Sequence, residues 1–242
     1  MKRILGLVLI LLLSGCSTRY LVKDDAVDFV YRINFGLEKR IIRVNGADVD
    51  TFQALSGWFA KDKNQVYWQG RRLRYADPLS ISVLNNYFAI DHSRVFGHGT
   101  TLLGANPDSF ELLQGGWSRD GENYFYGTRT VPVCDYESFR IIDEFTPFRA
   151  IDEKCYYWQR QIVQIENFAT LEILPGGYAV DESAVYFAER KIPEADVQSF
   201  EVKGDRFLSL AKDNQRCFLG PRIVDCNELA DRQARDFCGC DH

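Results

Sequence analysis

The sequence predicts an all-β protein built from tandem β-hairpin or meander repeats of about 29–32 residues. Six aspartates recur at intervals of 29, 29, 32, 29 and 32 residues, and a similar short phrase follows each of them. Helical periodicity is absent from the clearest copy, residues 109–131. We expect one elongated or solenoid-like array, with a closed, propeller-like array as the alternative. The aspartates are Asp62, Asp91, Asp120, Asp152, Asp181 and Asp213.

Each aspartate is predicted to start a hairpin turn, because its carboxylate can accept hydrogen bonds from the backbone two residues further on. In the clearest copy, strands are expected at residues 110–113, 117–119, 123–126 and 129–131, separated by glycines and by Asp120-Gly121. A four-stranded propeller blade usually takes about 40 residues, so an interval of 29 residues favours the open array.

The strand after each aspartate is predicted to be buried on both faces. The fourth position after the aspartate is apolar or cysteine: Val66, Val95, Tyr124, Tyr156, Val185 and Cys217. The fifth position is always aromatic, and these side chains are the expected repeat core: Tyr67, Phe96, Phe125, Tyr157, Tyr186 and Phe218. Consecutive strand positions point to opposite faces, so neighbouring repeats must cover both faces.

A second phrase, a polar corner that leads into a phenylalanine, recurs at residues 47–52, 106–110, 135–139 and 195–200. Its first copy precedes Asp62, so we expect residues 24–52 to form a degenerate opening repeat with Val30 and Tyr31 in its strand. No linker interrupts residues 24–226, which are predicted to form one β-repeat domain.

The N-terminus is predicted to be a lipoprotein signal peptide over residues 1–15. Lys2 and Arg3 precede an apolar run of ten residues, which is too short to span a bilayer. The ending Leu13-Ser14-Gly15-Cys16 resembles the bacterial lipoprotein cleavage box, which implies a lipidated Cys16 at the mature N-terminus. An ordinary signal peptide is the alternative. Ser17 differs from the inner-membrane retention residue of such proteins and favours the outer membrane, facing the periplasm. Residues 16–23 would be a tether.

Six further cysteines are expected to form disulfides in an exported protein. Cys134 and Cys155 have no other cysteine near them and are the expected pair. The pairing of Cys217, Cys226, Cys238 and Cys240 stays open, and a zinc site is the alternative for these four. They are expected to lock the end of the array, with residues 227–242 as a cysteine-rich cap.

The net charge of −5 becomes −7 once Lys2 and Arg3 leave with the signal peptide. This acidic balance argues against nucleic acid as a partner. The three histidines, His92, His98 and His242, lack a metal-ligand spacing, and His92 and His98 are expected to face solvent. No nucleophile, base and acid stand out together, so we expect neither an enzyme nor a cofactor.

Three other patterns have a structural and a functional interpretation. Asp62-Lys63-Asn64 and Asp120-Gly121-Glu122-Asn123 place oxygens at alternate positions, as calcium loops do, but turn formation is favoured. Trp68, Trp158 and Tyr126 are interpreted as core rather than as a binding surface. A basic row follows the aromatic strands and is interpreted as a solvated turn rather than as an anion-binding edge. Its members are Arg71, Arg72, Arg129, Arg160, Arg190, Lys191 and Arg222.

The phrases DKNQVYWQGRRL, DESAVYFAERKI and ADVQSFEVK resemble the DKNYY-type repeats of bacterial exported proteins over about residues 45–226. The full Asp-Lys-Asn triplet occurs only at Asp62-Lys63-Asn64. The resemblance implies a β-repeat fold and export, and it adds little about function.

These observations lead us to expect a lipid-anchored, non-catalytic periplasmic binding or scaffold lipoprotein whose β-repeat surface meets a protein partner. One alternative is an immunity lipoprotein that neutralises a periplasm-acting toxin. Another is a cell-wall glycan-binding module or enzyme.

Overall fold

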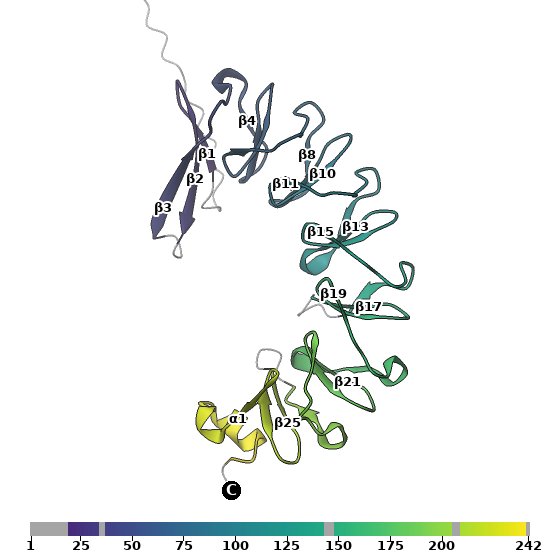
Figure 1. Ribbon diagram of the computed structural model, residues 1–242. Coiled ribbons are helices and arrows are strands. Elements are labelled where there is room, and N and C mark those ends of the chain that lie inside the picture. Colours follow the sequence, from purple (N-terminus) through teal and green to yellow (C-terminus); the bar gives the residue numbers. More distant parts are fainter. Residues whose placement is uncertain (1–18, 34–36, 143–147, 205–208, 241–242) are drawn as a thin grey trace, which may run out of the picture. The chain divides into compact units, whose positions relative to one another are not determined.

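Strands dominate the computed structural model, which describes residues 19–33, 37–142, 148–204 and 209–240 (Figure 1). These residues contain 27 strands in seven antiparallel sheets, and their one α-helix is α1 (Arg232–Phe237). The all-β, tandem-repeat fold class is therefore confirmed. No helix in these four ranges is long and apolar enough to cross a membrane. The chain divides into an N-terminal unit (Met1–Leu102) and a C-terminal unit (Leu103–His242), where we had expected one domain over residues 24–226.

The first sheet is a three-stranded meander of β1 (Arg19–Val22), β2 (Val27–Ile33) and β3 (Glu38–Arg43). Val30 and Tyr31 lie in β2, as expected. Residues 19–22 differ from the expected tether, because they pair with Val27–Val30 as β1. The Tyr20 ring packs on Phe29, with ring centroids 5.0 Å apart, and this contact explains why the segment is ordered as a strand.

Six four-stranded meanders follow, and each contains one of the six aspartates. The N-terminal unit holds β4 (Gln53–Ala54), β5 (Phe59–Lys61), β6 (Val66–Trp68), β7 (Arg71–Arg72), β8 (Ser82–Val83), β9 (Phe88–Ile90), β10 (Val95–Gly97) and β11 (Thr100–Thr101). The C-terminal unit holds β12 (Glu111–Leu112), β13 (Trp117–Arg119), β14 (Tyr124–Tyr126), β15 (Arg129–Val131), β16 (Arg140–Ile141), β17 (Arg149–Ile151), β18 (Tyr156–Trp158), β19 (Gln161–Val163), β20 (Glu172–Ile173), β21 (Tyr178–Val180), β22 (Val185–Phe187), β23 (Arg190–Lys191), β24 (Glu201–Val202), β25 (Leu210–Lys212), β26 (Cys217–Leu219) and β27 (Arg222–Val224).

Single-turn 3₁₀ helices lie in the connections between strands at Val49–Thr51, Gln114–Gly116, Phe168–Thr170, Pro175–Gly177 and Val197–Ser199, and another lies between β27 and α1 at Cys226–Glu228. Each strand of the six meanders has only two or three residues, so four strands fit into a 29-residue interval. The interval is nevertheless shorter than the roughly 40 residues of a usual four-stranded propeller blade.

The two 32-residue intervals gain their three extra residues between the first and second strands of a sheet. Ile141 and Arg149 are eight positions apart there, as are Val202 and Leu210, whereas the shorter repeats leave five positions, as between Ala54 and Phe59. The strand pairing is the same in both kinds of repeat, so the added residues lengthen one connection and leave the register unchanged.

The third strand of each meander is buried on both faces. Tyr67 packs with Val27 and Phe29 of the preceding sheet, while Val66 packs with Phe96 of the following one. The same alternation recurs inside the C-terminal unit, where Tyr157 joins one cluster and Tyr156 the next. All six aromatics at the fifth position after the aspartate are at most 1 % exposed. Consecutive sheets within each unit thus share one apolar layer.

Two further core positions were not recognised in the sequence. One is a small residue two positions before each aspartate: Ala60, Ala89, Ser118, Ala150, Ala179 and Ala211. Each stands directly opposite the core aromatic of the next strand, where a small side chain leaves space for the ring. The other is an aliphatic residue eleven positions after each aspartate: Leu73, Leu102, Val131, Val163, Ile192 and Val224.

The last sheet is covered by the C-terminal segment. Leu229 and Ala234 pack against Leu210 and Val224, so α1 buries the face that no further repeat covers. The residues expected to act as a cap therefore contribute apolar side chains as well as cysteines.

Truncating a core aromatic should destabilise the N-terminal unit. Phe96→Ala removes a fully buried ring and should lower the free energy of unfolding by about 3–5 kcal/mol. Leu79→Ala, at a side chain that is 88 % exposed, is the matched control and should change it by less than about 0.5 kcal/mol. Urea unfolding followed by tryptophan fluorescence measures both, and equal midpoints for the two variants would contradict the assignment.

Candidate functional site

All six aspartates lie at equivalent hairpin turns, and their carboxylates are buried. The Asp62 Oδ1 accepts hydrogen bonds from the backbone N–H groups of Asn64 (2.7 Å) and Gln65 (2.8 Å). Its Oδ2 accepts one from the N–H of Asp48 (2.9 Å), which begins the preceding polar corner. The other five aspartates repeat this arrangement. One carboxylate therefore closes its own hairpin and fixes the corner to it.

The hydroxyl group of the second phrase has the complementary role, which the sequence did not reveal. It accepts a hydrogen bond from the N–H of the residue directly after the aspartate, as Thr51 Oγ1 does from Lys63 (3.1 Å). The equivalent acceptors are Ser80, Ser109, Ser138, Thr170 and Ser199. Corner and hairpin are thus joined at two adjacent points in every repeat.

Wherever the core ring is tyrosine, its hydroxyl adds a further donor to the three or more N–H groups that already meet the carboxylate. The hydroxyl groups of Tyr67, Tyr157 and Tyr186 donate to the aspartate five positions earlier, at 2.8, 2.5 and 2.8 Å. Burial raises the pKa of Tyr186 to about 12, and the bond to Asp181 adds to the rise. Burial also acts to raise the pKa of Asp181, but its N–H and hydroxyl donors outweigh burial and hold that pKa below its ordinary value.

These hydrogen bonds favour turn formation over calcium binding as the role of the aspartates. At Asp120, Oδ1 accepts from the N–H groups of Glu122 and Asn123, and Oδ2 accepts from Asn106. The positive ends of the N–H dipoles thus point at the carboxylate oxygens that a cation would need. The turn geometry accounts for the aspartate at this position.

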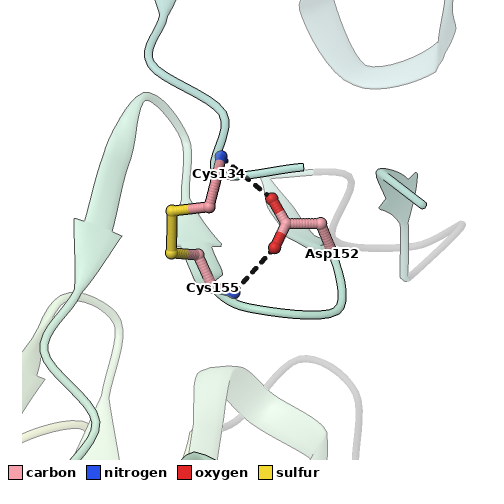
Figure 2. Close-up of side chains that lie close together, drawn as sticks. All are labelled: Cys134, Asp152 and Cys155. Carbon is pink, nitrogen blue, oxygen red and sulfur yellow. Dashed lines mark hydrogen bonds between the residues drawn. A yellow bond between two sulfur atoms is a disulfide. The ribbon is translucent and has the colours of Figure 1, made fainter. Parts of the chain in front are cut away.

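Cys134, Asp152 and Cys155 bring three potential ligand atoms within 4.8 Å of one another (Figure 2). The two sulfurs form a disulfide, with the Cα atoms 6.0 Å apart, so the expected pair is present. The Asp152 Oδ2 accepts from the N–H of Cys134 (3.1 Å), and its Oδ1 accepts from the N–H of Cys155 (2.7 Å). The group is a structural fastening, because neither the sulfurs nor the carboxylate is free for a metal ion.

The Cys134–Cys155 disulfide lies within one repeat. Cys134 lies in the connection from β15 to β16, and Cys155 lies in the turn between β17 and β18. The bond therefore fixes a corner to the hairpin of the sheet that the corner enters, in parallel with the Asp152 hydrogen bonds.

The remaining cysteines form two disulfides, Cys217–Cys238 and Cys226–Cys240, with Cα separations of 5.7 and 5.6 Å. The sequence had left the pairing of these four cysteines open. All four sulfurs are used in disulfides, so they are not free to form the alternative zinc site. Cys217 lies in β26 and Cys238 directly follows α1, so the bonds hold the C-terminal segment on the last sheet.

Ser80, His92 and Asp77 form a small polar cluster that superficially resembles a catalytic triad. Ser80 donates to Asp77 (2.6 Å), and the His92 Nδ1 lies 3.0 Å from Ser80 Oγ and 3.3 Å from an Asp77 oxygen. In a triad, the serine and the acid use different ring nitrogens. Here both face Nδ1, and Ser80 holds the repeat's structural hydroxyl position. His92 and His98 are exposed, and His242 lies outside the described residues.

The basic row is exposed at all seven positions, and the aromatic residues beside it are half-buried. Trp68 stands directly opposite Arg71 across the β6–β7 hairpin, as Tyr126 stands opposite Arg129 across β14–β15. Trp158 is also half-buried, so these rings are neither fully core nor free surface. Lys191 and Arg222 each form an ion pair with a glutamate at 2.5 Å.

The N-terminal unit has a cleft of about 430 Å³ where the aromatic and basic positions meet. Its floor is apolar, since Trp58 and Trp68 contact edge to face with ring centroids 5.9 Å apart. Arg32 and Arg71 also line the cleft, so it can bind a ligand that carries both an apolar group and a negative charge. The lining residues are Phe29, Tyr31, Arg32, Ile42, Trp58, Trp68, Gln69 and Arg71.

The cleft was not predicted as a unit, because its residues come from the irregular first sheet as well as from a repeat. Trp68 and Arg71 were noted in the sequence for their positions after Asp62, but Tyr31 was noted only as a strand residue of the opening repeat, and Arg32 carries no repeat signal. Only the packing of β2 against the turn between β6 and β7 brings them together.

Comparison with protein families gives two overlapping matches to the DKNYY family model, at residues 28–160 and 148–232. The matched segments include all six aspartates and both sides of the cleft. No curated protein and no solved structure matches the chain.

Removing one buried carboxylate should destabilise the fold in a pH-dependent way. The folded-state pKa of Asp181 is lowered, so its contribution is fully present above its unfolded-state pKa of about 3.9 and is lost as pH falls through the folded value. Asp181→Asn should cost about 1–3 kcal/mol at pH 7, and the difference from wild type should shrink below pH 3. Urea unfolding at both pH values measures this.

The matched control is Asp108→Asn, at an exposed aspartate of the same unit, which should leave the midpoint unchanged at either pH. A penalty for Asp181→Asn that is equal at both pH values would contradict a role for the carboxylate charge.

Peptide mapping without reduction should recover three linked pairs: Cys134–Cys155, Cys217–Cys238 and Cys226–Cys240. The double variant Cys134→Ala and Cys155→Ala should lose about 3 kcal/mol of stability, since the bond closes a chain segment of 21 positions. A Cys217–Cys226 peptide in material purified from cells would show that the C-terminal pairing is wrong.

Proposed function

The chain belongs to the DKNYY family, and from this premise we propose that it is a lipid-anchored, non-catalytic binding protein that presents its β-repeat surface to a protein partner. It would act at the periplasmic face of a bacterial outer membrane. The proposal has three parts, the anchor, the absence of catalysis and the partner, and a different observation supports each part.

The anchor is supported by the N-terminal sequence. The basic start, the short apolar run and the Leu13-Ser14-Gly15-Cys16 ending favour cleavage before Cys16 and acylation of its thiol and amine. Residues 1–18 lie outside the described part of the chain, so the support is chemical and not geometric. A disulfide-rich fold agrees with an oxidising compartment.

The non-catalytic part is supported by how the reactive side chains are used. The buried aspartates accept N–H donors, the recurring hydroxyl groups accept from the adjacent turn, and the described cysteines are joined in pairs. General bases and nucleophiles act through a lone pair that faces the substrate. In this fold the same lone pairs face the backbone.

A protein partner is supported by the composition of the aromatic cleft, which is the observation that carries the proposal. Tryptophan, tyrosine and arginine are the residues that most often dominate binding energy at protein interfaces. Trp58, Trp68 and Tyr31 lie half-buried beside exposed Arg32 and Arg71. Such rings present apolar area to a partner at little cost in side-chain entropy.

The anchor and the partner can be tested in one experiment. We expect full-length protein in intact bacteria to fractionate with outer membranes and to cross-link to one protein in roughly equal amount. Cys16→Ser removes the thiol that would be acylated and should leave unprocessed or soluble protein. Fractionation followed by cross-linking and mass spectrometry measures both properties.

Ser17→Ala, at the neighbouring position, is the control and should fractionate as wild type does. Unchanged processing and membrane association of Cys16→Ser would refute the anchor. A cross-link to cell-wall glycan without any protein partner would refute the binding proposal and favour a glycan-binding role.

A further inference from the structure

The aromatic cleft arises where the long strands of the first sheet meet a much shorter repeat sheet. β2 has seven residues and β3 has six, whereas β5 and β6 have three each. Phe29 and Ile42 are opposite each other in register and pack against the turn at Gly70, where an added Cβ would lie 2.7 Å from Phe29 Cβ. Tyr31 lies two residues beyond Phe29 on β2 and lines the space next to this contact.

One tyrosine ties the walls of the cleft together. The Tyr20 hydroxyl donates to the Trp58 carbonyl (2.9 Å) and accepts from the Gly70 N–H (3.1 Å). The Trp58 ring also packs edge to face on Tyr87, with centroids 4.7 Å apart. Because these contacts join the walls through the protein's own residues, a binding group meets walls that are already held together, which reduces the ordering cost of binding.

The charged side chains that line the cleft are both positive. Arg32 and Arg71 are the charged residues among those that line it, and both are exposed. Among the acidic residues of the first sheet, Glu38 forms an ion pair with Arg40 (2.5 Å) and Asp28 forms one with Arg43 (3.0 Å), and neither acid lines the cleft. The whole chain carries a net charge of −5, so this is a local positive site on an acidic protein.

We infer that the cleft binds an acidic peptide segment of the protein partner, with one apolar or aromatic side chain on the Trp58–Trp68 floor and carboxylates against Arg32 and Arg71. This inference rests on the proposed function and names the chemistry that the partner must present. Guanidinium groups bind carboxylates through paired N–H donors, which fixes the orientation of the segment.

The ring geometry favours a peptide over a sugar polymer. The planes of Trp58 and Trp68, which both line the cleft, are inclined at 74°, so the two rings form a notch rather than a flat platform. A notch of about 430 Å³ accommodates one or two side chains, whereas stacked sugar rings need flat aromatic faces. Gln69 contributes an amide at the rim that can hydrogen-bond a peptide backbone.

The test uses a phage-displayed library of random 12-residue peptides, selected on the full-length protein in detergent. We expect the enriched peptides to carry two or more carboxylates beside an aromatic or large aliphatic residue. Arg71→Glu should weaken binding of the best peptide at least tenfold by fluorescence anisotropy, and added salt should weaken it in wild type. Arg71 is exposed, so the variant should keep its fold.

The matched control is Arg129→Glu. Arg129 stands opposite Tyr126 in the C-terminal unit as Arg71 stands opposite Trp68, but it does not line the cleft. It should leave peptide binding unchanged within twofold. Enriched peptides without carboxylates, no enrichment, equal losses in the two variants, or binding of purified peptidoglycan that Arg71→Glu abolishes would each overturn the inference.

Cross-linking in cells separates this inference from the proposed function. A partner that cross-links equally to wild type and to Arg71→Glu would agree with the proposed function but would show that the cleft does not bind the partner. The absence of any protein cross-link would refute the proposed function itself.

Discussion

The buried aspartate carboxylate is the interaction on which the rest of the fold depends. A charged group inside a small β protein is costly unless donors surround it. Here each carboxylate meets two N–H groups of its own turn and one from the preceding corner, and three of them also meet a tyrosine hydroxyl. Strands of two or three residues provide few ladder bonds of their own. The hydrogen bonds of the carboxylate therefore stabilise these short hairpins, as additional ladder hydrogen bonds stabilise sheets with longer strands.

Mutual covering by neighbouring sheets is the second constraint. Because the third strand of each meander buries side chains on both faces, a single meander would expose an apolar surface. Ala60 stands opposite Tyr67, and an equivalent small residue stands opposite the core aromatic in each of the other five four-stranded sheets. This arrangement leaves space for one ring in each apolar layer. In the C-terminal unit the final layer is completed by Leu229 and Ala234, which replace the ring of a further repeat.

Sequence reasoning succeeded where the same side chain recurred in the same chemical setting. The spacing of Asp62 and its equivalents was sufficient to predict the turns, and the alternation of Val66 and Tyr67 was sufficient to predict burial on both faces. It overlooked the recurring small residue opposite the core aromatic and the recurring corner hydroxyl group, and it failed where the evidence lay outside the repeat. Residues 19–22 carry no repeat phrase. They form a strand because the Tyr20 ring packs on Phe29 and its hydroxyl hydrogen-bonds to the backbone of Trp58 and Gly70. The cleft could not be predicted for the same reason. The last four cysteines allow three pairings, and two of these have similar loop lengths, so spacing alone does not choose between them.

The crossed pairing of the last four cysteines has a consequence for biogenesis. Along the chain the order is Cys217, Cys226, Cys238 and Cys240, and the two bonds join the first to the third and the second to the fourth. A chain that enters an oxidising compartment from its N-terminus presents Cys217 and Cys226 first, and an oxidant acting in order of appearance joins those two. The mature connectivity then requires thiolate attack on that bond and exchange of partners. If the protein is exported as proposed, maturation of its C-terminal end would thus depend on a disulfide isomerase, whereas Cys134 and Cys155, adjacent in the cysteine order, would need only an oxidant.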